Sequence, residues 1–219
     1  MPASAPSQDP PPAPRTRNAA ATRERILRAA IAEFAAHGFG GARIERICEE
    51  AGIAGRMIYY YFQSKESLFI AALDAVYAQL AEAEAALDLE SLDPRDAMRR
   101  LVAFVWHHFR AHPELLGLLA TENQLGGQHV RGRPTGARHA SRQLAILAGI
   151  LERGAAAGQF RRDATVLDVF MTISALCYHP LANRHTLADY LGRDMEDDAV
   201  AGAWLAHIGN VVLDYLTRR

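Results

Sequence analysis

Residues 44–69, IERICEEAGIAGRMIYYYFQSKESLF, decide the fold of the N-terminal third of this chain. Their spacing predicts two short helices joined by a tight turn. Cys48 is a small residue for the inner face of the first helix, Gly52 suits a left-handed turn, and Ile58 can pack back beneath the first helix. Two helices that cross over such a turn form a helix-turn-helix, whose second helix enters a DNA major groove.

The residues on either side extend this motif into a four-helix unit. Gly38 is expected to stop the helix that precedes the motif. Ser64 is expected to cap a long helix that carries the chain away from it. The expected bounds are 22–37 with Thr22 as its cap, 44–51, 55–61 and 64–87.

The composition of the 219 residues favours an all-α protein of about nine helices. Half of the residues are hydrophobic, helix formers dominate, and runs of β-branched residues bounded by turns are scarce. The formal net charge is −1, but residues 1–67 carry nine basic and seven acidic side chains, whereas the remainder carries 15 basic and 18 acidic ones. A basic head on an acidic body is compatible with nucleic-acid binding at one end.

The two cysteines and the hydropathy pattern indicate the compartment. Cys48 and Cys177 lie in apolar helical patterns without a CxxC pair, so a reduced, cytoplasmic protein is expected. No apolar run approaches the ~20 residues that a membrane span needs. The Pro- and Ala-rich N-terminus lacks the charged and apolar regions of a signal peptide.

The chain divides into a tail, a head and a body. Residues 1–17 contain six prolines and are expected to be a disordered tail, in which Arg15 and Arg17 either reach DNA or stay solvated. The head is expected at 18–63 and the helical body at 64–219. In the body, a loop is expected at 126–138 and an interruption or kink of the helix at Pro180. The expected body helices are 94–111 after the cap Asp93, 113–125, 138–156, a helix from about 163 or 165 to 178, 185–191, and a last helix capped by Asp194.

Residues 22–69 resemble the TetR family of one-component transcriptional regulators, most clearly in the run IYYYFQSKE at 58–66. The resemblance implies a homodimer, with a DNA-binding head at 18–63 and a ligand-binding and dimerisation body at 64–219. It implies that the last two long helices of each subunit form a four-helix interface. It also implies a repressor, in which a small molecule in the body shifts the fourth helix and pulls the heads out of register with the operator.

Position by position, the resemblance assigns DNA contacts to the head. Lys65, the only lysine in the chain, matches a family lysine at the start of the fourth helix and is expected to donate to a phosphate. The other matches are Arg56, Met57 and Tyr60 as base readers, and Tyr59 and Tyr61 as phosphate and groove contacts.

Two departures from the family pattern alter this set. Ala42 and Arg43 stand where a Thr or Ser pair is usual, so the second helix loses its side-chain cap while Arg43 gains a charge for phosphate. Gly55 and Arg56 resemble the family's Lys/Arg-Gly pair in reversed order, which would let Arg56 reach a guanine edge.

Polar or aromatic residues on otherwise apolar body helices are candidates for lining a ligand cavity. The same residues would serve equally well as ordinary core. They are Met98, Phe104, His107, His108, Phe109, Glu122, Asn123, Phe170, Ser174, Tyr178 and His179.

The last helix carries a long apolar stripe, which either forms the dimer interface or is buried within the subunit. The resemblance favours the interface. The stripe consists of Trp204, Leu205, Ile208, Val212, Leu213 and Leu216.

Metal binding and catalysis are not expected. His108 and His112 are spaced to share a helix face, with His107 beside them, but no Cys or carboxylate completes a tetrahedral set. No GxSxG, HExxH, P-loop or GxGxxG pattern occurs, and no cofactor is expected. Two alternatives stay open: an adaptor of the same fold that has lost DNA binding, and a metal sensor.

Overall fold

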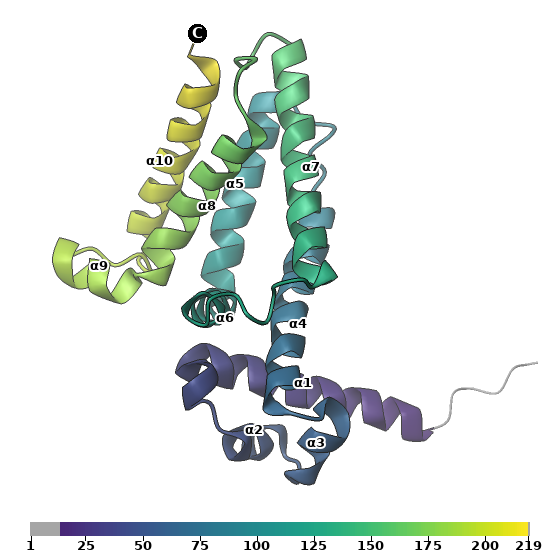
Figure 1. Cartoon of the computed structure of the whole chain (residues 1–219). Helices are drawn as coiled ribbons and strands as arrows, with labels where there is room; N and C mark the ends of the chain where they lie inside the picture. The colour runs from purple at the N-terminus through teal and green to yellow at the C-terminus, as the bar shows by residue number, and fades with distance from the viewer. Residues whose placement is uncertain (1–13, 219) are drawn as a thin grey trace, which may run out of the picture.

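The fold is all-α, as the sequence predicts, with ten helices among the described residues rather than about nine. In the computed structural model, residues 14–218 are described, apart from the side chains of 14–17 and 134–141. Figure 1 shows a head of α1–α3 at one end and the body at the other. The helices are α1 (Pro14–Gly41), α2 (Ile44–Ala51), α3 (Arg56–Phe62), α4 (Lys65–Ala85), α5 (Pro94–Ala111), α6 (Pro113–Gln124), α7 (Pro134–Ala156), α8 (Val166–Ala182), α9 (Arg184–Leu191) and α10 (Asp198–Thr217).

The head is held together by one apolar cluster to which α1, α2, α3 and α4 all contribute. Ile26 and Phe34 on α1, Ile47 on α2, Ile58 on α3 and Phe69 on α4 are fully buried in it. Burying one such side chain is worth ~1.5–3 kcal/mol. Helices as short as α2 and α3 are marginal in isolation, so this shared core is what keeps them folded.

Helix α4 belongs to both the head and the body. Its 21 residues span ~30 Å. The apolar cluster of the head continues along α4 as far as Leu80 and takes in Leu115 and Leu118 from α6. The domain boundary expected between residues 63 and 64 falls at the N-cap of this helix. Any displacement of the upper part of α4 therefore acts directly on the core of the head.

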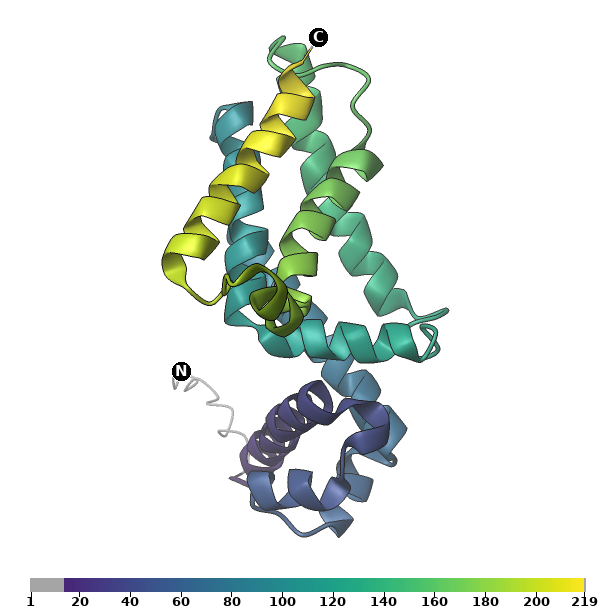
Figure 2. The ribbon, with the colours of Figure 1, turned by 90° about the vertical axis from the view of Figure 1, so that its left-hand side faces the viewer.

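Helix α6 lies against α1 and makes a second connection between head and body (Figure 2). A Cβ atom on Gly117 would lie 2.7 Å from the carbonyl oxygen of Ala35. Only a residue without a side chain permits this approach. The pairing of Gly117 with Ala35 therefore sets the distance between the two helices.

The body packs α5, α7, α8 and α10 around its own core. Met98, Trp106, Cys177, Ile208 and Leu216 are almost completely buried there. Burial raises the pKa of the Cys177 thiol to about 12, so this thiol stays protonated.

Of the interruption or kink expected at Pro180, the interruption is wrong, because α8 continues through Pro180 to Ala182. A proline inside a helix leaves the carbonyl four residues earlier without its usual donor. Here that carbonyl belongs to Leu176, and the indole Nε1 of Trp204 donates to it at 3.0 Å. The neighbouring helix α10 thus supplies the hydrogen bond that the proline cannot.

The predicted start of the first helix is also wrong. It begins at Pro14 rather than Thr22, and the Thr22 hydroxyl donates to the Asn18 carbonyl within the helix. Proline suits the first turn of a helix, where its missing N–H is not needed. The predicted stop at Gly38 is confirmed in the backbone, because Gly38 leaves the helical conformation with φ 65° and ψ 176°, and the bounds of α1 reach Gly41 only by joining two helical pieces across this kink. Residues 1–13 of the expected tail lie outside the described residues.

Two later helix starts differ from the predictions. Helix α7 begins at Pro134, so the loop expected to reach residue 138 ends at Arg133. The cap of α10 is Asp197, which accepts from the backbone N–H groups of Ala199 and Val200, rather than Asp194. The predicted caps Ser64 and Asp93 are confirmed by their side-chain hydrogen bonds to backbone N–H groups.

Helix α10 is long and apolar enough to cross a membrane by length and composition alone, contrary to the expectation from the sequence. The core helix of a soluble protein passes the same test. Ile208, Val212 and Leu216 on α10 are buried in the core of the body, so the apolar character of α10 has an explanation within the fold.

Candidate nucleic-acid interface and ligand cavity

The turn between α2 and α3 has the predicted geometry. Gly52 ends α2 in the left-handed region, with φ 62° and ψ 47°. The backbone N–H of Ile53 then donates to the Cys48 carbonyl at 3.0 Å. Cys48 is buried beneath this turn and Ile58 beneath α3, in the same cluster. These contacts hold α3 across α2 as the second helix of a helix-turn-helix.

The N-terminus of α2 is supported from α1. Arg43 is the N-cap and makes no side-chain capping hydrogen bond, as its sequence position predicts. Instead, Glu33 Oε1 on α1 accepts from the Arg43 backbone N–H at 2.8 Å and from Arg46 Nε at 2.7 Å. Hydrogen bonding from Arg46 is the largest cause that lowers the pKa of Glu33. A carboxylate at this end of α2 also opposes the positive end of the helix dipole.

Helix α3 turns its apolar side inward and its aromatic and basic side outward. Ile58 and Phe62 are buried, whereas Arg56 is exposed. Tyr59 and Tyr60 are 57% and 77% exposed, which is unusual for large hydrophobic residues. The remaining predicted contacts are the exposed Arg43 and Gly55 and the half-buried Met57 and Tyr61. Six of the eight predicted contact residues therefore lie on α3 or at its N-cap with part of their surface open to solvent, and Arg43 is exposed at the N-cap of α2.

Lys65, the eighth, has an intramolecular partner that the sequence does not reveal. Its Nζ donates to the Ala42 carbonyl at 2.6 Å and lies 5.0 Å from the centre of the Phe39 ring. This contact ties the first residue of α4 to the chain that leaves α1. An ammonium group has three hydrogens to donate, so one carbonyl does not use up its capacity.

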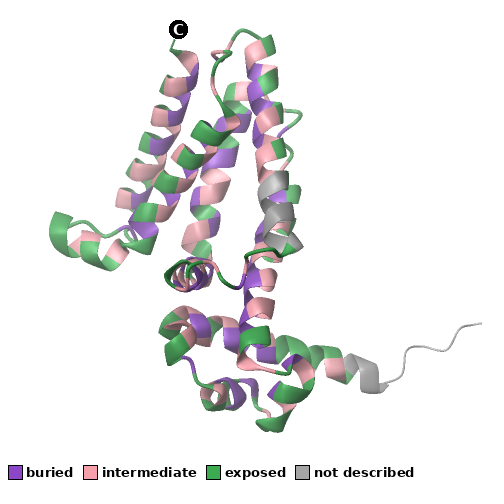
Figure 3. Cartoon of the chain, in the orientation of Figure 1, coloured by how far each residue is buried: buried purple, intermediate pink, exposed green. Residues whose placement is uncertain are grey.

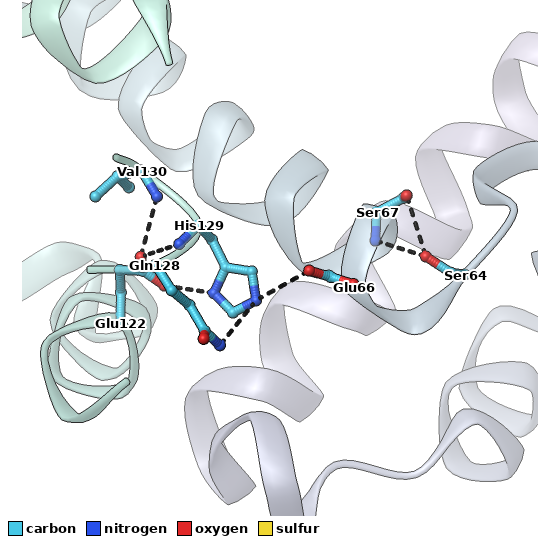
Figure 4. Close-up of polar contacts among 7 residues, drawn as sticks. All are labelled: Ser64, Glu66, Ser67, Glu122, Gln128, His129 and Val130. Carbon is cyan, nitrogen blue, oxygen red and sulfur yellow. Dashed lines mark hydrogen bonds and ion pairs between the residues drawn. The ribbon is translucent and has the colours of Figure 1, made fainter. Parts of the chain in front are cut away.

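A buried polar cluster joins the body to the first turn of α4 (Figure 4). Glu122, near the end of α6, accepts from the backbone N–H groups of His129 and Val130 at 2.7 and 3.0 Å, and its other oxygen lies 2.7 Å from His129 Nδ1. The His129 ring packs against Phe69 and lies 3.9 Å from the carboxylate of Glu66. The loop after α6 is therefore fixed to α4 at the junction of head and body.

A cavity of about 260 Å³ lies inside the body, between α4, α5, α6, α7 and α8. Its walls are mainly leucine, isoleucine, valine and aromatic side chains. Four of the predicted pocket residues line it: Phe109, Phe170, Ser174 and Tyr178. All four lie on α5 or α8, where the sequence shows polar or aromatic residues on apolar helices.

The other predicted pocket residues lie elsewhere. Glu122 is committed to the His129 loop, Met98 is core, and Asn123 and His179 are exposed. Phe104 packs on the cluster of the head and against the ring of His108, while His107 is exposed. A residue's helix face relative to the cavity depends on how the helices pack together, and composition does not reveal it.

The cavity also has walls on α4 and α7 that the sequence does not predict, which include Tyr77, Glu84 and Gln143. Glu84 is only 3% exposed, and burial raises the pKa of its carboxyl to about 7. It stands in residues 78–87, AQLAEAEAAL, where Glu82 and Glu84 both have alanine on either side. Nothing in that pattern separates the buried Glu84 from the exposed Glu82.

The stripe predicted as the dimer interface is largely used inside the subunit. Ile208, Val212 and Leu216 are buried in the body's core, which is the alternative stated above, and Trp204 and Leu205 pack partly against it. The open faces of α8 and α10 lie side by side (Figures 1 and 3). Exposed residues on these faces are Leu167 (62%), Met171 (57%) and Ala175 on α8, and Ala203, Ala206 and Asn210 on α10.

Two of the three clustered histidines come together. The rings of His108 and His112 are 4.4 Å apart, and His112 Nδ1 lies 3.0 Å from Glu114. Burial lowers the pKa of His108, which favours its neutral form. Over the part of the chain that the structure describes, no group of three or more His, Cys, Asp or Glu side chains is placed to hold a metal ion.

Comparisons with known proteins agree with this geometry. Residues 26–72 match the model of bacterial regulatory proteins of the tetR family, and residues 94–212 match that of the tetracyclin repressor-like C-terminal domain. The chain is 42% identical to the HTH-type transcriptional repressor NicS of Pseudomonas putida over 204 residues, covering 93% of this chain and 96% of NicS.

A more distant relative and a solved structure extend the comparison. The HTH-type transcriptional repressor SCO4008 of Streptomyces coelicolor is 36% identical over 139 residues, which cover 63% of this chain and 69% of that protein. The fatty acid degradation regulator FadR of Bacillus halodurans superimposes with a TM-score of 0.67 at 19% identity, covering 88% of this chain and 94% of FadR. The FadR match bears on the fold alone.

Proposed function

Because the chain belongs to the TetR family of transcriptional regulators, we propose that it is a homodimeric repressor that a small molecule releases from its operator. The observation that best supports DNA binding is which side of α3 faces the solvent. Ile58 and Phe62 fix the helix to the core, while Arg56, Tyr59 and Tyr60 project into solvent. An exposed arginine and tyrosines on the second helix of a helix-turn-helix are suited to reading base edges and contacting phosphates.

The ligand-responsive part of the proposal is supported by the position of α4. One end of this helix carries Lys65, which holds the Ala42 carbonyl in the head. The other end carries Tyr77 and Glu84, which line the cavity. A ligand that binds one position of α4 more tightly than another shifts the population of head positions accordingly. Strong release from the operator requires a preference of ~5 kcal/mol between the two states.

The Glu122–His129 cluster is the second proposed route of coupling. It connects α6, which lines the cavity through Leu115 and Leu119, with Glu66 on the first turn of α4. Together with the Gly117–Ala35 contact, it makes the head follow the body as a unit. In the dimer, two heads must present their α3 helices about one turn of DNA apart, ~34–36 Å, so small rotations of α4 change the fit.

The dimer itself is proposed to form through the open faces of α8 and α10. Small residues on α10 permit close approach of a second subunit, and Leu167 and Met171 on α8 supply exposed apolar surface. The interface is thus still formed by the last two long helices, as the family resemblance implies. Its residues are those on the open faces of α8 and α10 and not the buried stripe of α10.

The test of DNA binding uses the full chain and a duplex from upstream of its own gene, titrated by fluorescence anisotropy over a salt series. The wild type is expected to bind with an affinity that falls steeply as salt rises. Arg56→Ala is expected to cost ~1–3 kcal/mol and to relax preference at one base pair. Arg99→Ala, which removes an exposed arginine from the body, is the matched control and should bind like the wild type. An affinity that does not change with salt concentration, or no binding at all, would favour the alternative of an adaptor that has lost DNA binding.

The repressor step is tested separately by transcription in vitro from the same upstream region. Added protein is expected to reduce transcript, and a compound that raises the melting temperature of the free protein is expected to restore it. An increase of transcript on adding protein would instead indicate an activator.

A further inference from the structure

Glu84 is the exceptional group in the wall of the cavity. Its side chain is almost completely buried, and its Oε2 has no hydrogen-bond partner within the described part of the chain. An unpaired carboxylate in an apolar site is costly and is normally removed or paired. A carboxyl group in such a site indicates that a bound ligand supplies its hydrogen-bond partner.

The groups around Glu84 do not pair it. Arg142 on α7 is the cation whose charge favours the ionised form, yet no hydrogen bond or ion pair joins the two side chains among the described residues, and Arg142 is exposed. Among the described residues, the other ionisable groups that line the cavity are Tyr77 on α4 and Tyr178 on α8. Burial raises the pKa of both phenols, so both stay neutral.

The remaining described walls are mainly apolar and aromatic, with Gln143 and Ser174 as polar exceptions. Phe109 and Tyr178 meet edge to face with ring centres 6.5 Å apart, and Phe170 lines the same cavity. Aromatic faces attract a desolvated cation and accept a hydrocarbon frame equally well. Over its described residues, the cavity therefore combines one acidic side chain with surroundings that suit an apolar molecule.

Resting on the function proposed above, we propose that the effector is a mainly apolar organic cation, whose single basic nitrogen binds against the Glu84 carboxylate. A protonated amine or ring nitrogen supplies the missing donor and charge, while an aromatic or aliphatic frame of about a dozen heavy atoms fills the cavity, a count set by its volume. An anion would be repelled by the ionised carboxylate, and a neutral molecule could at most donate a hydrogen bond and would leave the negative charge uncompensated.

The proton balance on binding follows from the same geometry. In the empty cavity, burial keeps the pKa of Glu84 at about 7, so part of the population is protonated at neutral pH. A bound cation favours the ionised form, and Glu84 releases its proton to the solvent. The bond broken is O–H of the carboxyl group, and the acceptor is the buffer.

Three probes with one carbon skeleton test the proposal: 4-phenylbutylamine, 4-phenylbutanol and 4-phenylbutyrate, which are cationic, neutral and anionic at pH 7. Their affinities for the full chain are measured by calorimetry. The amine is expected to bind at least about tenfold more tightly than the alcohol, and the acid more weakly still. Repeating the amine titration in buffers of different ionisation enthalpy is expected to reveal proton release.

Glu84→Gln is the decisive variant, and Glu82→Gln, an exposed neighbour on α4, is its matched control. The first is expected to abolish both the preference for the amine and the proton release, whereas the second keeps both. Equal binding of amine and alcohol by the wild type, a preference for the acid, or no binding of any probe at millimolar concentration would overturn the proposal. If Glu84→Gln fails to fold, the ranking of the three probes on the wild type still decides it.

The operator titration separates this inference from the proposed function. If the protein binds its duplex in a salt-dependent way but does not bind the amine, it is a DNA-binding regulator with a different ligand, and only the inference about the effector fails. A protein that binds the amine through Glu84 but no DNA retains the site and loses the repressor role.

Discussion

The indole Nε1 of Trp204 donates a 3.0 Å hydrogen bond to the carbonyl of Leu176, the group that a residue other than proline at position 180 would have engaged. The bond joins α10 to α8 at the point where α8 lacks one of its own helical hydrogen bonds. It also explains why a proline so near the end of an apolar helix does not break it.

Trp204→Phe is expected to lower the free energy of unfolding by about 1 kcal/mol, because the Leu176 carbonyl loses its donor. In a Pro180→Ala background the alanine N–H can take over that carbonyl, so the same change should cost clearly less. Urea unfolding of the wild type, Trp204→Phe, Pro180→Ala and the double variant measures the two costs. An equal cost in both backgrounds would mean that the effect comes from lost packing alone.

Lys65→Met keeps the aliphatic stem and removes the ammonium group that donates a hydrogen bond to the Ala42 carbonyl. The variant is expected to unfold more easily by about 1–2 kcal/mol, since hydrogen bonds to charged groups contribute more than neutral ones. If Lys65 also contacts a phosphate, the salt dependence of DNA binding should become shallower by about one phosphate's share, ~0.9 in the logarithmic slope. Arg43→Ala, at an exposed position, should change the slope without changing stability. A stable Lys65→Met protein would remove Lys65 from the structural contacts.

Gly117→Ala places a methyl group 2.7 Å from the Ala35 carbonyl and should force α6 away from α1. A loss of about 1–3 kcal/mol is expected from this overpacking. Gly149→Ala on α7 is the matched control, because a Cβ there meets no atom within 4 Å. It should be neutral or stabilise the protein by up to about 1 kcal/mol. Thermal unfolding measures both, and equal effects at the two positions would contradict the close approach.

Met171→Glu puts a charge on the open face of α8 and is expected to convert dimers into monomers, because the carboxylate would be desolvated against the partner subunit. Light scattering after size exclusion gives the mass directly. Gln124→Glu, on an exposed residue of α6, is the control and should leave the mass unchanged. A Met171→Glu protein that stays dimeric would move the interface away from this face.

Glu84→Gln is expected to change how stability depends on pH. The pKa of Glu84 in the folded chain, about 7, lies above its ordinary value of 4.5, so the folded state holds the proton that the unfolded state has already lost. Wild-type stability should therefore fall as pH rises from about 4.5 through the folded-state pKa of about 7, and should level off at about pH 8, where both states have lost the proton. The variant lacks this group and should be more stable than the wild type at pH 8, by up to about 3 kcal/mol, and equal to it near pH 4.5. Chemical unfolding at the two pH values decides it.

Much of the head could be predicted because its signals are local. Gly52 requires a left-handed turn, Ser64 is an N-cap, and the alternation of Ile58 and Phe62 with exposed residues fixes which side of α3 faces inward. Each of these depends on residues within about one turn of helix. The four cavity residues on α5 and α8 could be predicted for a similar reason, because they are polar or aromatic side chains on otherwise apolar helices.

What only the tertiary structure decided are contacts between residues far apart in the chain. Lys65 meets Ala42, Trp204 meets Leu176, and Glu84 is buried while Glu82 two positions away is exposed. The sequence by itself determined which segments become helices and which turn joins α2 to α3, because backbone preferences and capping act over a few residues. The angle and depth at which those helices pack is set by the shapes of all their side chains together. That packing determines whether a carboxylate faces water or a cavity.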